Sequence, residues 1–136
     1  MVTLAEALDM QRKSKAKPTN KYGAKPVKVD GMRFDSTGEY HRWLELQQHQ
    51  KYKLIRCLKH HVAFPIEING DVVCDYEADF TYDLKVSPDG HPEKWEFVVE
   101  DFKSPITAAN PLYRLKIKLM QAVHNIRVLE TGLKKG

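Results

Sequence analysis

The dipeptide Asn69-Gly70 constrains the fold of this chain more than any other feature of the sequence. Both residue types tolerate positive φ angles, and the pair lies between two apolar segments, residues 61–68 and 72–84. A two-residue turn of this kind joins antiparallel strands. The sequence therefore predicts a long β-hairpin near the middle of the chain.

Further elements are predicted on both sides of this hairpin. Residues 27–34 predict a short strand or hairpin with a turn at Asp30-Gly31. Residues 36–50 predict a helix with Ser36 as N-cap and Glu39 at the third helical position. After the central hairpin we expect a strand, a loop, a helix and a last strand, at residues 94–102, 105–111, 112–124 and 126–130.

The order of these elements predicts a mixed α/β fold of helix, three-stranded meander, helix and strand. The last helix links two strands over a span long enough for a parallel crossover, which is expected to be right-handed. Helical spacing also predicts the side chains that face the core. They are Tyr40, Trp43 and Leu44 in the first helix, and Leu112, Leu115, Leu119, Ala122 and Val123 in the last.

The composition is that of one soluble domain. The chain has 136 residues, of which 42% are apolar and 29% charged. No segment approaches the roughly 18 apolar residues of a membrane helix, and the N-terminus has no apolar leader. Because the two cysteines, Cys57 and Cys74, are widely separated, they fit a reducing compartment. We therefore expect a cytoplasmic protein, in the host cytoplasm if a phage encodes it.

The N-terminal segment has a different composition from the rest of the chain. Residues 11–28 contain no acidic residue, two prolines and few large apolar residues, so we expect residues 1–26 to be a mobile basic arm. A capping box from Thr3 to Glu6 indicates a short helix within it. Residues 27–136 would then form the single domain. Candidate DNA-binding residues are Lys13, Lys15, Lys17 and Lys21 in the arm and Lys116 in the last helix.

The charges are unevenly distributed along the chain. Residues 62–101 hold two lysines against eleven acidic residues, whereas residues 1–28 hold seven basic residues against two acidic ones, and residues 102–136 hold seven against one. Basic flanks suit a polyanion, because neutralised phosphates release counterions. The acidic centre would repel the same polyanion unless cations are bound there. Solvated strand and turn positions are the simpler explanation for most of these acids.

Strand periodicity selects the candidate chemical site. In residues 95–103, alternation places Asp101 and Lys103 on one face and Glu100 on the other. The preceding strand carries Asp79, which can lie beside Asp101 and face the same way. Carboxylate pairs of this kind bind Mg²⁺, which polarises a phosphate and lowers the pKa of a bound water. A neighbouring lysine can activate that water or offset charge in the transition state.

These residues resemble the PD-(D/E)XK nuclease superfamily, with Asp79 as the upstream acid and Asp101-Phe102-Lys103 as the acid-x-Lys element. More narrowly, the chain is similar to a family of small phage and prophage proteins regarded as endonucleases. The shared pattern, over about residues 20–130, is Lys21-Tyr22-Gly23, Phe34-Asp35-Ser36 with Glu39, Ala78-Asp79-Phe80, Val99-Glu100-Asp101-Phe102-Lys103 and a basic helix near Tyr113 to Met120.

The resemblance implies a restriction-endonuclease-like core and Mg²⁺-dependent DNA cleavage that leaves a 5′-phosphate, with Mn²⁺ expected to substitute. It implies that Asp79 and Asp101 bind the metal, that Glu39 supports the metal or water, and that Lys103 positions or activates water. The motif's proline is replaced by Ala78. Glu100, beside Asp101, would join the metal site only through a β-bulge.

Duplex or branched DNA is thus the expected partner, and structure selectivity for junctions is favoured because so small a chain has no room for an elaborate base-reading domain. A homodimer would place two such sites on two strands. RNA remains an alternative substrate. The competing readings are a non-catalytic nucleic-acid-binding module, or a phage assembly protein with an inactive nuclease-like fold. In those cases Asp101 and Lys103 would be a structural ion pair, and Glu39 only part of the helix cap.

Other chemistries fit the sequence less well. The six histidines show no zinc spacing, and in an extended strand His60 and His61 would point to opposite faces. The cysteines form no CxxC pair, and the sequence has no phosphate-binding glycine loop or nucleophile elbow.

Overall fold

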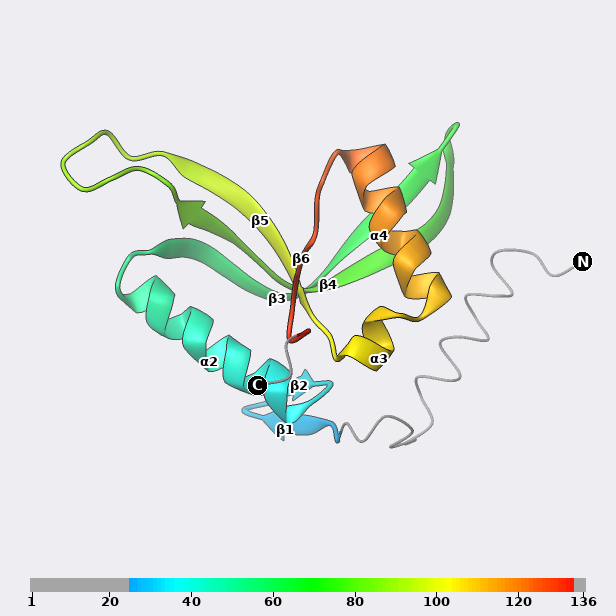
Figure 1. Cartoon of the computed structure of the whole chain (residues 1–136), viewed down its shortest axis with the longest axis horizontal. Coiled ribbons are helices and arrows are strands. Elements are labelled where there is room, and N and C mark those ends of the chain that lie inside the picture. The colour runs from blue at the N-terminus through cyan, green and yellow to red at the C-terminus, as the bar shows by residue number, and fades with distance from the viewer. Residues whose placement is uncertain (1–24, 134–136) are drawn as a thin grey trace, which may run out of the picture.

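The computed structural model describes residues 25–133, which form a mixed α/β fold around a four-stranded sheet (Figure 1). The strand order is β3-β4-β5-β6, with β5 and β6 parallel and the other neighbours antiparallel. A separate two-stranded sheet pairs β1 with β2. The elements are β1 (Val27–Val29), β2 (Met32–Phe34), α2 (Thr37–Lys51), β3 (Ile55–Ile68), β4 (Asp71–Lys85), β5 (Trp95–Phe102), α3 (Pro105–Ala108), α4 (Pro111–His124) and β6 (Leu129–Thr131).

Local sequence signals account for most of these boundaries. Asn69 and Gly70 both have positive φ and join β3 to β4, so the predicted central hairpin is confirmed. Asp30 and Gly31 do the same between β1 and β2. Helix α2 begins after Ser36, whose Oγ accepts a hydrogen bond from the Glu39 N–H at 3.1 Å.

Three boundaries differ from the sequence predictions, and one of them is that of β6, which covers Leu129–Thr131 rather than residues 126–130. Strand β3 begins at Ile55 rather than at residue 61, because a bulge near Cys57, which has positive φ, interrupts the alternation that identifies a strand. Residues 105–108 form the short helix α3 rather than loop, since Ser104 caps its first turn and Pro105 fits that turn.

The core consists of two hydrophobic clusters, and each contains residues of one long helix (Figure 1). On β4, the side chains of Cys74, Tyr76 and Ala78 belong to the cluster that includes α4, whereas Phe80 and Tyr82 belong to the cluster that includes α2. The change from one cluster to the other falls at Asp79. That residue therefore lies at the boundary between the two halves of the core.

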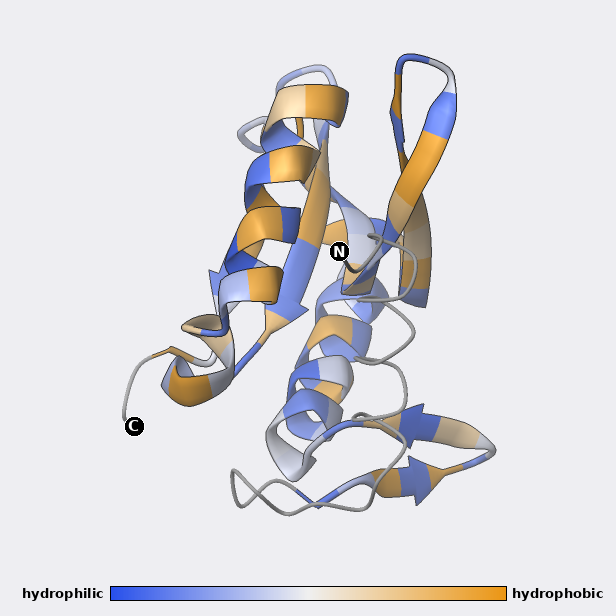
Figure 2. Cartoon of the chain, turned by 90° about the vertical axis from the view of Figure 1, so that its right-hand side faces the viewer, coloured by the Kyte–Doolittle hydropathy of each residue, from blue (hydrophilic) through white to orange (hydrophobic). Residues whose placement is uncertain are grey.

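The inward faces of both helices differ from the predictions. Helix α2 is mostly hydrophilic (Figure 2), and Leu46 is buried whereas Leu44 is exposed. Helix α4 buries Tyr113 and Met120, while Leu115, Ala122 and Val123 are exposed. The prediction is confirmed for Trp43 and Leu119, which pack against the two clusters. It is wrong for the exposed residues, because the amphipathic Tyr113 and the buried Met120 occupy the inner face of α4.

Candidate functional site

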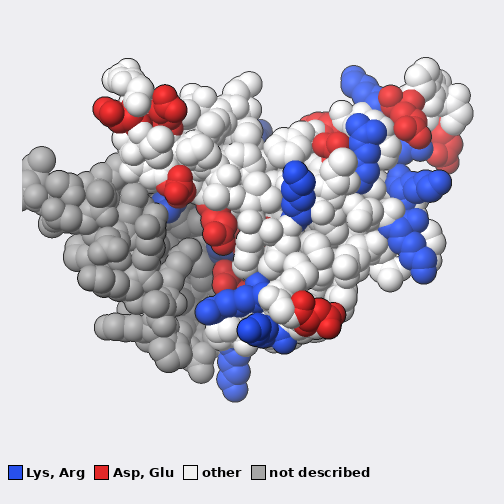
Figure 3. Space-filling model, turned by 180° about the vertical axis from the view of Figure 1, so that it is seen from behind, with Lys and Arg blue, Asp and Glu red and all other residues white. Residues whose placement is uncertain are grey.

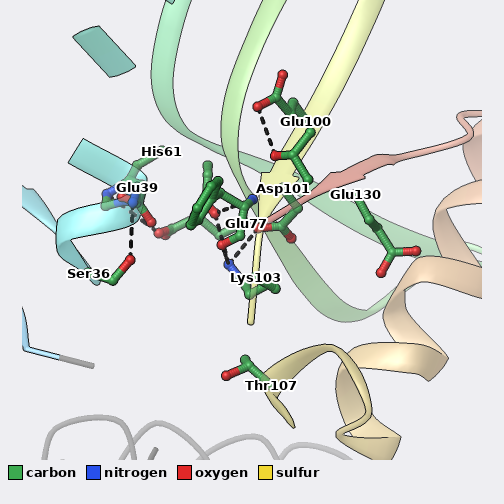
Figure 4. A network of polar contacts seen from close by, with 12 residues as sticks. Ser36, Glu39, His61, Glu77, Glu100, Asp101, Lys103, Thr107 and Glu130 are labelled. Carbon is green, nitrogen blue, oxygen red and sulfur yellow. Dashed lines mark hydrogen bonds and ion pairs between the residues drawn. The ribbon is translucent and has the colours of Figure 1, made fainter. Parts of the chain in front are cut away.

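Asp79 and Asp101 lie next to each other where β4 and β5 stop pairing. Figure 4 shows Asp101 beside Lys103. The register pairs Phe80 with Glu100, which brings the two aspartates opposite each other as the next pair along the ladder. The Lys103 Nζ lies 2.9 Å from Asp79 Oδ2 and 2.5 Å from Asp101 Oδ1. The predicted proximity of these three side chains, here called the carboxylate–lysine cluster, is confirmed.

Further hydrogen bonds hold the two carboxylates in place. The Phe102 N–H donates to Asp79 Oδ2 at 2.8 Å, and the Tyr76 hydroxyl donates to Asp101 Oδ2 at 2.5 Å. Asp79 is 3% exposed and Asp101 1% exposed. Buried carboxylates of this kind are stable only when donors or cations surround them, so their orientation is fixed.

Burial and neighbouring charges shift the pKa values of Asp79 and Lys103. Burial raises the pKa of Asp79 well above its usual range, and the negative charge of Asp101 raises it further, although Lys103 acts in the opposite direction. Burial opposes the charge on Lys103, but the two aspartates outweigh this and raise the pKa of its ammonium group. The cluster therefore keeps Lys103 charged between two acids that repel each other.

Glu39 reaches this region from the first turn of α2. One carboxylate oxygen of Glu39 and one of Asp79 lie within 4.8 Å of each other. Gly38 permits this approach, because a Cβ there would lie 2.6 Å from the Phe102 ring. The structure thus brings Glu39 next to Asp79, as the sequence predicted, whereas the groups of ligand atoms within 4.8 Å of one another do not include Asp101.

His60 and His61, which show no metal-ligand spacing in the sequence, lie beside Glu39 in the structure. His60 Nε2 and His61 Nε2 lie 3.1 Å and 3.2 Å from Glu39 Oε2. The expectation that they point to opposite faces is wrong, because His61 has positive φ and breaks the strand alternation. The adjacent pair His60-His61 was the sequence feature that could have indicated a second set of metal ligands. Histidine is enriched several-fold at positive φ, but such residues are uncommon, so the sequence does not predict this conformation at His61.

The histidines also change the ionisation of Glu39. Burial alone would raise its pKa, but interactions with His60, His61 and Asp79 outweigh burial and lower the pKa to about 2. The same contact with Glu39 raises the pKa of His61. Glu39 is therefore a buried carboxylate that remains ionised. Its backbone N–H takes part in the helix cap, whereas its side chain contacts the two histidines.

Glu100 belongs to a different set of contacts on the other side of β5 (Figure 4). Arg42 donates to both of its carboxylate oxygens, at 2.7 Å and 2.9 Å. The hydroxyls of Tyr82 and Thr131 donate to it at 2.6 Å and 3.0 Å. We call these four residues the Glu100 cluster. They confirm that strand alternation, without a bulge, separates Glu100 from Asp101.

Of the lysines predicted to bind DNA, only Lys116 lies among the described residues. The capping box, the Lys21-Tyr22-Gly23 motif, Lys13, Lys15 and Lys17 lie outside the described residues. Lys116 lies on α4, partly buried, where its charge acts on the Cys74 thiol. On the face in Figure 3, the basic side chains of the described residues are intermixed with acidic ones and do not form one continuous patch.

The donor set of the site fits a divalent cation. Glu39, Asp79 and Asp101 supply carboxylate oxygens, the ligands that Mg²⁺ prefers. Glu39 Oε1 is buried and has no hydrogen-bond partner, as expected of an acceptor that a cation would satisfy. Four side chains each place one potential ligand atom within 4.8 Å of the other three. They are Asp35, Glu39, His61 and Asp79.

Comparison with family models, with curated proteins and with solved structures finds no match to this chain. Within residues 25–133, no helix is both long and apolar enough to cross a membrane. The geometry of the site therefore carries the functional argument.

Proposed function

We propose that this protein is a metal-dependent DNA endonuclease with a restriction-endonuclease-like core, in which Asp79, Asp101 and Lys103 form the catalytic centre. The observation that carries the proposal is the carboxylate–lysine cluster: two buried aspartates on paired strands share one lysine. Glu39 lies beside Asp79 and completes the ordered set of the resembled superfamily. A phage origin, DNA as substrate and cytoplasmic localisation follow from that resemblance and belong to the proposal.

The residues have distinct roles in this proposal. Asp79 and Asp101 would hold Mg²⁺, with Glu39 assisting from α2, and Mn²⁺ would substitute. When bound, the ion would neutralise charge on the scissile phosphate and help to activate the attacking water. Burial and the negative charge of Asp101 raise the pKa of Asp79, so a divalent cation bound by the two carboxylates would favour the ionised form of Asp79.

Lys103 would orient the attacking water and offset negative charge in the transition state. Its side chain has a raised pKa and remains an ammonium group at neutral pH, which suits electrostatic stabilisation better than proton abstraction. Contacts with both aspartates hold its Nζ beside the proposed metal ligands.

The proposal is tested with purified full-length protein, supercoiled plasmid and a labelled four-way junction, in Mg²⁺, Mn²⁺ or EDTA. We expect metal-dependent cleavage that Asp79→Asn and Asp101→Asn abolish. Asp83→Asn is the matched control, because Asp83 lies on β4 but pairs with Arg56 away from the cluster. Circular dichroism would verify that each variant is folded.

The cleavage products also distinguish between the kinds of endonuclease that the proposal allows. A higher rate on the junction than on the plasmid would indicate branch selectivity, and linear rather than nicked plasmid would indicate a dimer with paired sites. No cleavage by folded protein in any metal, together with a gel shift in EDTA, would overturn the proposal in favour of a nucleic-acid-binding module. Cleavage of RNA alone would overturn the choice of DNA.

A further inference from the structure

Glu39, His60 and His61 form a compact group of metal-ligating atoms beside the carboxylate–lysine cluster. We call it the histidine–glutamate cluster. Both histidine Nε2 atoms face the same carboxylate oxygen, Glu39 Oε2, at 3.1 Å and 3.2 Å. One nitrogen from each ring and one oxygen of the glutamate lie within 4.8 Å of one another. Two imidazoles and one carboxylate thus converge from two elements, β3 and α2.

The surroundings hold this group in a fixed arrangement. The two imidazole rings stack with their centroids 3.6 Å apart, and His60 also packs against Phe34 at 4.5 Å between centroids. The side chains of Glu39 and His60 are 1% and 7% exposed, whereas that of His61 is 25% exposed. The cluster is therefore rigid on its inner side and accessible from the side of His61.

The spacing is close to that of ligands around one ion. Metal–nitrogen and metal–oxygen bonds of about 2.0–2.1 Å at tetrahedral angles place ligand atoms roughly 3.3 Å apart. The observed nitrogen–oxygen separations of 3.1 Å and 3.2 Å differ from this by a few tenths of an ångström. A hydrogen-bonded pair would have the same spacing, so distance alone does not distinguish the two.

A second, independent observation points to a ligand. Glu39 Oε1 is buried without a hydrogen-bond partner, although the whole residue is only 1% exposed. An ionised carboxylate with one unsatisfied oxygen is costly to bury unless a cation completes its surroundings. Asp79 and Asp35 each have an oxygen within 4.8 Å of ligand atoms of Glu39 and His61, so further ligands are at hand.

We propose that Glu39, His60 and His61 form a transition-metal site that selects Zn²⁺-class ions, including Co²⁺, over Mg²⁺. Imidazole nitrogens suit Zn²⁺, Ni²⁺ and Cu²⁺, whereas Mg²⁺ prefers oxygen ligands and retains several waters. The carboxylate–lysine cluster offers only oxygen to a metal, so the two neighbouring sites differ in the ion they prefer. This site shares Glu39 with the proposed catalytic centre but does not require DNA cleavage.

The test measures binding of Zn²⁺ by calorimetry and of Co²⁺ by visible absorption, in full-length protein with excess Mg²⁺ and without DNA. We expect one tight Zn²⁺ site and a Co²⁺ band typical of nitrogen and oxygen ligands. His60→Gln and His61→Gln should each weaken Zn²⁺ binding at least about tenfold. His41→Gln, an exposed histidine on α2, is the matched control and should leave it unchanged.

Two further measurements keep the proposal falsifiable. Asp101→Asn should retain Zn²⁺ affinity within about twofold even though it abolishes the proposed cleavage, so failure of the nuclease proposal would not affect this one. In the unmodified protein, Zn²⁺ should shift the NMR signals of the side-chain nitrogens of His60 and His61. Equal affinity in His61→Gln, or no shift of these signals, would overturn the proposal and leave a structural histidine–glutamate pair.

Discussion

Glu100 and Asp101 are adjacent in the sequence, and both are completely buried, yet they belong to opposite kinds of environment. The Glu100 cluster surrounds one carboxylate with a bidentate arginine and two hydroxyls, so its charge is balanced and its oxygens are satisfied. The carboxylate–lysine cluster instead opposes two aspartates with a single ammonium group. Its two carboxyl groups outnumber its one ammonium group, and burial together with the charge of Asp101 raises the pKa of Asp79.

The difference shows how structural and chemical carboxylates can be distinguished in this molecule. Burial does not separate Glu100 from Asp101, and neither does strand pairing. What separates them is whether the neighbouring donors neutralise the charge. A satisfied buried ion pair contributes to folding, whereas an excess of buried negative charge lowers stability and suggests a place for a cation.

The largest effect should come from exchanging acids for amides at these two positions. Asp101→Asn should lower the rate of DNA cleavage about 10³-fold, because it removes a proposed metal ligand in a buried site. Glu100→Gln should lower the free energy of unfolding and leave the cleavage rate of the folded fraction nearly unchanged. Single-turnover assays on folded protein separate the two, and a catalytic loss in Glu100→Gln equal to that in Asp101→Asn would break the comparison.

The next largest effect concerns the arginine that neutralises Glu100. Arg42→Met leaves a buried carboxylate without its cation and should lower the free energy of unfolding by about 3 kcal/mol. This is the low end for a buried pair, because the Arg42 side chain is 20% exposed. Denaturant unfolding gives the value. The control, Arg56→Met, removes an exposed pair with Asp83 and a contact with Trp95, and should cost about 1 kcal/mol. Equal losses would show that the Glu100 cluster is not a specially stabilising feature.

Mg²⁺ should stabilise the carboxylate–lysine cluster and have no effect on the Glu100 cluster. At 100 times its dissociation constant, Mg²⁺ should raise the free energy of unfolding by about 2.7 kcal/mol, because it binds the folded state alone. Thermal unfolding in Mg²⁺ and in EDTA measures this increment. Asp101→Asn should abolish it, whereas a variant altered only in the Glu100 cluster, Thr131→Val, should keep it. An increment that survives Asp101→Asn would place the ion elsewhere.

The smallest effect is expected for a single hydroxyl of the Glu100 cluster. Thr131→Val removes one hydrogen bond, at 3.0 Å, from a carboxylate that keeps Arg42 and Tyr82, so we expect a loss of about 1 kcal/mol in unfolding free energy. Cleavage should be unchanged. A substantial change in cleavage rate would mean that the two clusters are coupled across β5.

Much of the fold was predictable because local signals and tertiary structure agree. Ser36 and Asn69-Gly70 fix a helix start and a hairpin through backbone chemistry alone, and each performs that role. The exposure of Leu115 and the burial of Met120 were not predictable, because the rotation of α4 depends on packing against residues far away in the sequence.

The candidate site was predictable in part for the same reason. Alternation along β5 correctly placed Asp101 with Lys103 and excluded Glu100. It misplaced His60 and His61, because a single left-handed residue reverses the side on which a strand presents its side chains. Their nearness to Glu39 depends on how α2 packs against β3, which neither segment encodes alone.

The two-residue turn at Asn69-Gly70 has a consequence for the order of folding. It joins the two longest strands, β3 and β4, so their pairing closes the shortest loop in the sheet and has the smallest entropic barrier. The parallel pairing of β5 with β6 spans residues 103–128 and should form last. We therefore expect Asp79 on β4 to reach its final position early in folding. Thr131 on β6 should form its hydrogen bond with Glu100 only near the end.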